Sequence, residues 1–131
     1  CLCTEKCANI LTAGTHGTTF GGNPVACAGA KYILDCLTDD FMNDVTAKGE
    51  YIRSKLAEID EVKSVTGLGL MLGIELKTKN AGEIAKKCSE NGLLILTAKT
   101  KLRMLPPLVI TKEEIDKGVN ILEKILKEEK I

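Results

Sequence analysis

A stretch rich in glycine and threonine near the start of the chain is the part of the sequence best suited to binding a small anion. It runs from Gly14 to Pro24, GTHGTTFGGNP, and places Thr18 and Thr19 side by side among four glycines. Glycines expose backbone N–H groups and the hydroxyls add donors, so the stretch suits a phosphate or a carboxylate before a helix start. It matches neither the GxxxxGK[ST] nor the GxGxxG pattern. A glycine-rich turn that only caps a helix is the alternative.

Three cysteines and a single histidine are the other residues near the start that could do chemistry. Structural zinc usually takes four ligands at CxxC-type spacing, whereas Cys1, Cys3 and Cys7 have only His16 as an additional imidazole. We therefore expect no metal site. A lone histidine in a glycine-rich loop more often fixes the loop through a backbone hydrogen bond than acts as a general base, and we expect that role for His16.

Length and charge limit the possible partners. The chain has 131 residues, the size of one compact domain but short for an enzyme that must also enclose a cofactor. Lys plus Arg and Asp plus Glu both number 18, so no charge excess indicates nucleic acid or a membrane surface as a partner. The longest mostly apolar run, Gly67 to Ile74, is far shorter than the roughly 20 residues that span a bilayer. We expect a protein that binds neither.

The first residue and the cysteine content bear on whether the chain is complete and on its cellular environment. Cys1 stands where a natural start has methionine, and no secretory signal pattern follows, so we expect an incomplete chain. The six cysteines accompany ample aliphatic residues for a core, which is unlike a small disulfide scaffold. We expect a reducing, cytoplasmic setting.

Two helices are predicted in the first half of the chain. Asn23 followed by Pro24 is a helix-start signal, and apolar residues at helical spacing continue it to Leu37. A second helix is predicted to begin near Asn43 or Asp44, because apolar positions up to residue 59 share one helical face.

The second half of the chain alternates short strands with helices. The predicted elements are strands 62–65 and 70–76, a helix 81–91, strands 93–97 and 102–105, and a closing helix that Thr111 and Glu114 begin as a capping box. This ββαββα order predicts a small α/β (α+β) domain over residues 41–131, with residues 1–40 leading into it.

Three segments in the same order resemble the class III aminotransferases, and together they cover essentially the whole chain. They are Gly14 to Ala28, GTHGTTFGGNPVACA; Gly67 to Leu76, GLGLMLGIEL; and Leu102 to Leu108, LRMLPPL. The resemblance implies the type I fold of pyridoxal-phosphate enzymes. Residues 1–40 would then end the large cofactor domain and link it to the C-terminal small domain, residues 41–131.

The resemblance also implies an activity and roles for three residues. Phe20 and the two glycines after it are most similar to the branch that moves an amino group from N-acetylornithine to 2-oxoglutarate, a step of arginine biosynthesis. Thr19 matches the threonine that binds the phosphate of pyridoxal phosphate in the partner subunit of a homodimer. Thr18 stands at a substrate-contacting position that is usually serine. Arg103 matches the arginine that binds the substrate α-carboxylate through two parallel hydrogen bonds.

Other features of the family have no counterpart in this chain. The lysine that bonds the cofactor and the aspartate that pairs with its ring lie upstream in the family, so we assign no catalytic residue and expect the chain alone to be inactive. Thr66 stands where many relatives have arginine, and no function falls on it. Apart from the resemblance, Arg103 would be a solvated strand arginine.

Three alternatives to this interpretation stay open. The chain could be a free-standing regulatory module that binds an amino acid through Arg103 and the glycine loop. It could instead be a purely structural dimerisation domain, or part of an ornithine or 4-aminobutyrate aminotransferase.

Overall fold

Two compact units make up the protein in the computed structural model, which describes residues 4–10 and 12–128. The first unit is Cys1–Thr38 and the second is Asp39–Ile131. The division therefore falls after residue 38, where the sequence placed a boundary after residue 40. That residues 1–40 end a larger cofactor domain stays a prediction.

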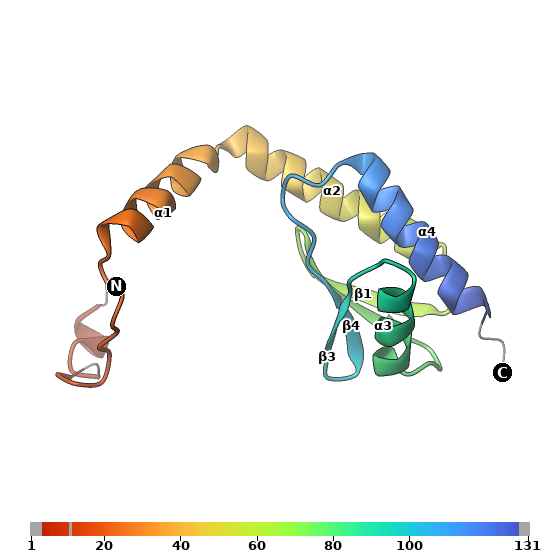
Figure 1. Ribbon diagram of the computed structural model, residues 1–131, viewed down its shortest axis with the longest axis horizontal. Helices are drawn as coiled ribbons and strands as arrows, with labels where there is room; N and C mark the ends of the chain where they lie inside the picture. The colour runs from red at the N-terminus through yellow and green to blue at the C-terminus, as the bar shows by residue number, and fades with distance from the viewer. Residues whose placement is uncertain (1–3, 11, 129–131) are drawn as a thin grey trace. The chain divides into compact units, whose positions relative to one another are not determined.

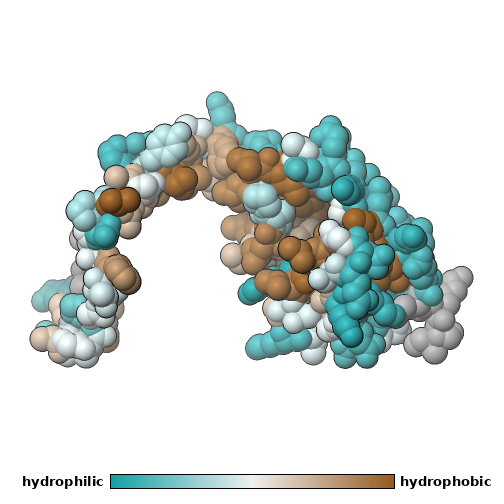
Figure 2. Space-filling model, viewed as in Figure 1, coloured by the Kyte–Doolittle hydropathy of each residue, from teal (hydrophilic) through white to brown (hydrophobic). Residues whose placement is uncertain are grey.

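The first unit contains a short turn of 3-10 helix and a longer α-helix. The turn is η1, Glu5–Cys7, and the helix is α1, Pro24–Cys36. As predicted, Asn23 is the N-cap residue and Pro24 lies in the first turn of α1. None of the residues of α1 is buried, and Ile33 on this helix stays 57% exposed. Apolar surface accordingly interrupts the polar surface along α1 (brown in Figure 2).

The second unit is a two-layer α+β domain (Figure 1). Its elements are α2 Asp39–Ala57, β1 Val62–Leu68, β2 Met71–Leu76, α3 Ala81–Glu90, β3 Leu96–Ala98, β4 Lys101–Met104 and α4 Lys112–Glu128. From β1 onward this is the predicted ββαββα order, so the predicted fold class is confirmed. Three details were wrong: α2 begins several residues before Asn43, β1 extends to Leu68 instead of ending at residue 65, and β3 begins after Leu93 rather than at it.

The four strands form one antiparallel sheet in the order β1-β2-β4-β3. β1 and β2 make a hairpin whose turn consists of Gly69 and Leu70, and Gly69 has φ +52°, a value that side chains disfavour. β4 carries Arg103 and lies inside the sheet, paired with β2 on one side and β3 on the other. The strand that bears Arg103, the residue expected to bind a carboxylate, is therefore held by hydrogen-bonded ladders on both sides.

Alternation along the strands gives the sheet a buried face and an open face. In β2, Leu72 and Ile74 are fully buried, whereas Met71 is 64% exposed. Helices α2, α3 and α4 pack on the buried face (Figure 1), and the outward side of α4 is hydrophilic (Figure 2). The largest fully buried side chains all belong to this unit: Ile52, Leu56, Leu72, Ile74, Ile84, Leu102, Leu122 and Cys88.

A capping box at its first turn determines where α4 begins. The predicted capping box forms, because Thr111 N–H donates to Glu114 Oε2 at 2.9 Å and Glu114 N–H donates to Thr111 Oγ1 at 3.2 Å. The predicted apolar stripe is buried against the sheet: Ile115, Val119, Leu122 and Leu126.

Candidate functional site

The loop that carries Thr18 and Thr19 is folded by its own backbone. Gly21 N–H donates to Thr18 O at 3.4 Å, and Asn23 N–H donates to Phe20 O at 3.2 Å, so Thr18–Asn23 turns twice within six residues. A Cβ on Gly21 would lie 2.5 Å from Thr18 Cγ2, so any larger residue at this position would displace the Thr18 side chain. Both threonines are exposed, and within the described residues their hydroxyls meet no hydrogen-bond partner.

The start of α1 offers fewer free donors than the sequence suggests. Asn23 Oδ1 accepts from Val25 N–H at 3.0 Å and from Ala26 N–H at 3.2 Å. Cys27 N–H donates to Asn23 O at 2.9 Å, and Pro24 has no N–H. These N–H groups of the helix are therefore already used, so an anion at this loop would be bound by the threonine hydroxyls and by N–H groups of the loop itself.

His16 does not have the expected structural role. Among the hydrogen bonds of the described residues, none involves His16, so the prediction that it fixes the loop was wrong. Thr15 does so instead, because both its N–H and its hydroxyl donate to Thr12 O, at 3.2 and 2.7 Å.

Arg103 lies on the open face of the sheet in the second unit. In the register it stands opposite Gly73 of β2 and Leu96 of β3. Gly73 has no side chain, and a Cβ built on it would lie 3.3 Å from Thr66 Oγ1 and 3.7 Å from Lys101 Cδ. Arg103 lines an open pocket of about 500 Å³ together with Thr66, Leu68, Met71 and others.

The Arg103 guanidinium is free to bind an anion. It is exposed, and no hydrogen bond or ion pair joins it to any residue that the structure describes. Leu68 and Met71, which are 86% and 64% exposed, give the pocket an apolar wall. An unpaired guanidinium beside apolar surface suits a carboxylate that carries an aliphatic chain.

A carboxylate close to Arg103 is already fully engaged. Glu75 Oε1 lies 2.7 Å from Lys63 Nζ, and Glu75 Oε2 lies 3.3 Å from Lys101 Nζ and accepts from Ser64 Oγ at 3.1 Å. Hydrogen bonds from Lys63 first, then from Lys101 and Ser64, lower the pKa of Glu75 to about 2. Glu75 is therefore ionised at neutral pH and paired with lysine.

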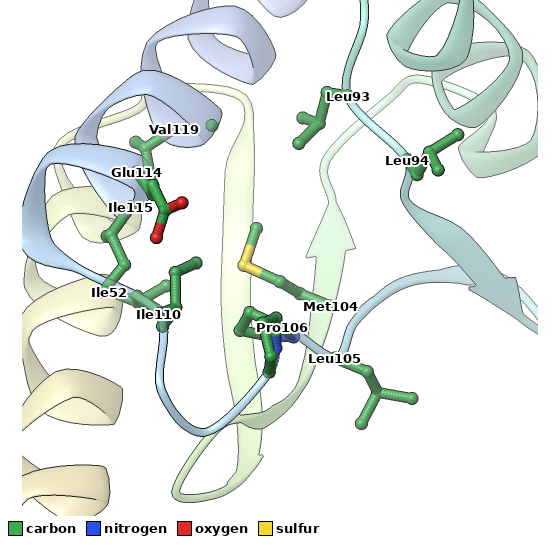
Figure 3. Close-up of a pocket in the computed structure, with 12 residues that line it drawn as sticks. Ile52, Leu93, Leu94, Met104, Leu105, Pro106, Ile110, Glu114, Ile115 and Val119 are labelled. Atoms are coloured by element: carbon green, nitrogen blue, oxygen red, sulfur yellow. The ribbon is translucent and has the colours of Figure 1, made fainter.

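A second pocket, of about 260 Å³, lies between α4 and the segment after β4 (Figure 3). Leu93 and Met104 point into it, while Leu94 and Leu105 point away (Figure 3). Its acidic group, Glu114, caps α4 as described above. An apolar space without a free cation is poorly suited to an amino acid's carboxylate, so Arg103 marks the better candidate site.

The structure adds two observations on metals and membranes. The described residues contain no group of three or more His, Cys, Asp or Glu side chains that could hold a metal ion. Cys1 and Cys3 lie outside the described residues, and Cys7 is an exposed free thiol. Of the helices in the described part of the chain, none combines the length and apolar composition needed to cross a bilayer.

The sequence predicts Thr18, Thr19 and Arg103 as site residues but does not point to Lys101 and Glu75. Thr18 and Thr19 belong to the first unit and Arg103 to the second. Strand alternation could have pointed to Lys101 and Glu75. Lys101 lies two residues from Arg103 and therefore on the same face of β4, and Glu75 lies two residues from Gly73 on the same face of β2. Pairing them required the register between β2 and β4.

Comparisons with known proteins give the family and the fold of the chain. The Aminotransferase class-III family model matches residues 1–126. Acetylornithine aminotransferase of Haemophilus ducreyi is 45% identical over 97% of this chain and 33% of its own length. Acetylornithine aminotransferase of Elizabethkingia anophelis has a TM-score of 0.76 at 34% identity, covering 91% of this chain and 34% of that one. Ornithine aminotransferase of Toxoplasma gondii has a TM-score of 0.74 at 32% identity, covering 92% and 32%.

These matches span almost all of this chain but only about a third of each relative's length. The family match and the fold agree with the three motif segments, one of which carries the unpaired Arg103. The chain belongs to the class III aminotransferase family.

Proposed function

We propose that this chain supplies the C-terminal part of a pyridoxal-phosphate-dependent aminotransferase that moves an amino group from N-acetylornithine to 2-oxoglutarate. The observation that carries the proposal is the exposed, unpaired guanidinium of Arg103 on an inner strand. The acetylornithine aminotransferase of Haemophilus ducreyi supports the choice of substrate. The reaction would serve arginine biosynthesis.

Arg103 would bind the α-carboxylate of the substrate. Its planar guanidinium can donate two parallel hydrogen bonds to one carboxylate, which fixes the orientation of the substrate as well as its position. Gly73 places no side chain of its own opposite Arg103, and Leu68 and Met71 offer apolar contact to the aliphatic part of an amino acid.

Thr19 would hold the cofactor's phosphate, and Thr18 would contact the substrate. The residues present fit a phosphate, because two adjacent exposed hydroxyls have no partner within the described residues and a phosphate oxygen can accept from each. Pyridoxal phosphate, when bound, supplies the electron sink that amino-group transfer requires. The contribution of this chain is to hold and orient.

The proposed enzyme is a cytoplasmic homodimer in which the Thr18–Thr19 loop serves the partner subunit's site. Its other partners are a small amino acid and a 2-oxo acid. The lysine that bonds the cofactor would lie in the part of the relatives that this chain does not cover. The chain alone therefore has no catalytic residue and is inactive.

The test is glutamate formation from N-acetylornithine and 2-oxoglutarate, with pyridoxal phosphate added. The chain extended upstream to the length of its relatives should be active, and the 131-residue chain should not. In the extended chain, Arg103→Met should raise the KM for both substrates at least about tenfold, because a charge-assisted pair is lost. Lys86→Met, which removes an exposed cation on α3, is the matched control and should change nothing. Equal KM values for the two variants would refute the role of Arg103.

Ornithine is the second candidate substrate, because the fold matches an ornithine aminotransferase almost as well as an acetylornithine one. The ratio of kcat/KM for the two amino donors decides between them. The regulatory-module alternative predicts micromolar binding of an amino acid by the 131-residue chain alone, which isothermal titration measures. Such binding, with no activity in the extended chain, would overturn the proposal.

A further inference from the structure

An ion cluster shares the open sheet face with Arg103. Lys101 and Arg103 are two residues apart on β4, so both side chains leave the same face. Gly73 on β2 is paired with Arg103, and Glu75 lies two residues further along the same strand, in the row of Lys101. Glu75 is the one acidic residue that the four described strands contain. It is therefore the strand carboxylate that could compete for Arg103.

The geometry of Glu75 shows why that competition does not occur. Both of its oxygens are occupied, Oε1 by Lys63 at 2.7 Å and Oε2 by Lys101 at 3.3 Å and by Ser64 Oγ at 3.1 Å. The two lysines approach from opposite sides, because Lys63 stands on β1 and Lys101 on β4. Lys101 is thus the cation on the side of the carboxylate that faces Arg103.

The stem of Lys101 also lies over the gap beside Arg103. Its Cδ would be 3.7 Å from a Cβ built on Gly73, the residue paired with Arg103, and Thr66 Oγ1 would be 3.3 Å from that Cβ on the β1 side. Long side chains can reach a diagonal neighbour on an adjacent antiparallel strand. Without Lys101, the carboxylate of Glu75 could therefore swing across Gly73 to the guanidinium.

We propose that Lys101 is a positioning residue that holds Glu75 away from Arg103, so that the guanidinium stays free for a substrate carboxylate. The inference rests on the proposed function, because it concerns the access of substrate to Arg103. Lys63 binds the same carboxylate from the β1 side and does not separate the two groups. The two lysines therefore have different effects although each carries the same charge.

The experiment measures KM and kcat for N-acetylornithine and 2-oxoglutarate in the extended, cofactor-loaded chain. Lys101→Met should raise both KM values about threefold to fivefold, the scale of one exposed ion pair, and leave kcat within about twofold. Lys63→Met is the matched control with the same loss of charge, and its KM values should equal those of the unsubstituted enzyme. Lys101→Arg should keep them as well.

The double variant Lys101→Met with Glu75→Gln separates competition from loss of a cation. It should restore both KM values, because the competing carboxylate is gone. If Lys101→Met and Lys63→Met raise KM equally, or if the double variant stays impaired, the positioning role is wrong while the proposed function stands. If Arg103→Met itself leaves KM unchanged, the proposed function fails and this inference fails with it.

Discussion

Gly49 on α2 is expected to be essential for packing, and alanine at this position should destabilise the second unit. Its backbone lies against the β1–β2 turn, so a Cβ built there would be 2.4 Å from Gly69 O and 2.8 Å from Gly69 C. Both atoms belong to the backbone, so no side chain can rotate away. Since real Cβ contacts essentially never fall below 3.0 Å, the helix or the turn must move by at least about 0.6 Å.

The magnitude follows from two opposing terms. Overpacking of this kind costs roughly 2 kcal/mol, and replacing a helical glycine by alanine gains about 1 kcal/mol of helix propensity. The Gly49→Ala variant should therefore lose about 1 kcal/mol of unfolding free energy. Gly118→Ala is the matched control on α4, because its Cβ would meet only the flexible Leu93 Cδ1, at 3.4 Å. That variant should keep the propensity gain and become about 1 kcal/mol more stable.

Urea unfolding of the 131-residue chain, followed by circular dichroism, measures both changes. The two midpoints should move in opposite directions at an unchanged m-value, and the thermal midpoints should differ by roughly 10 °C. If Gly49→Ala raises the urea midpoint as Gly118→Ala does, the close approach of α2 to the turn is not present in solution.

Three further predictions concern the side chains of Arg53, Glu75 and Cys88. Arg53 donates hydrogen bonds to two carbonyl oxygens of the edge strand β1, at 3.1 and 2.6 Å. Arg53→Met should leave these carbonyls free to pair with another chain and so speed aggregation. An increase in light scattering no faster than that of the unsubstituted chain would contradict this. Lysine hydrogen bonds, from Lys63 above all, lower the pKa of Glu75 to about 2, so its stabilising effect is complete above about pH 4.5 and is lost as the pH falls toward 2. Urea midpoints measured across this range should fall less steeply for Glu75→Gln, and identical slopes would refute the pairing. Burial raises the pKa of the Cys88 thiol to about 11, whereas Cys27 is exposed. Peptide mass spectrometry should then find iodoacetamide on Cys27 well before Cys88, and equal labelling would argue against the core.

The elements that the sequence predicted best are those with local chemical signals at their ends. Asn23 and Pro24 start α1, and Thr111 with Glu114 starts α4, because each signal satisfies backbone donors within three residues of itself. The start of α2 was predicted too late. Its first turn contains Asp39 and Asp40, which favour a helix N-terminus by charge and leave no trace in apolar spacing.

The candidate site was predictable by residue type but not by environment. The family resemblance selects Arg103, and strand alternation places it on one face together with Lys101. That Glu75 pairs with Lys101 rather than with Arg103 depends on the register across β2 and β4, a non-local property. The resemblance likewise selects Thr18 and Thr19. It does not predict that Asn23 accepts hydrogen bonds from the first N–H groups of α1.

The place of Arg103 within the sheet has a consequence for how this enzyme family can diversify. Arg103 stands on an inner strand, whereas the exposed Leu68 and Met71 flank the hairpin turn and Leu96 stands on the edge strand β3. Mutations at these three positions change surface that little else packs against, so they can accumulate while Arg103 keeps its place on the inner strand. A library randomised at Leu68, Met71 and Leu96 should therefore yield folded variants whose surface around Arg103 differs in shape.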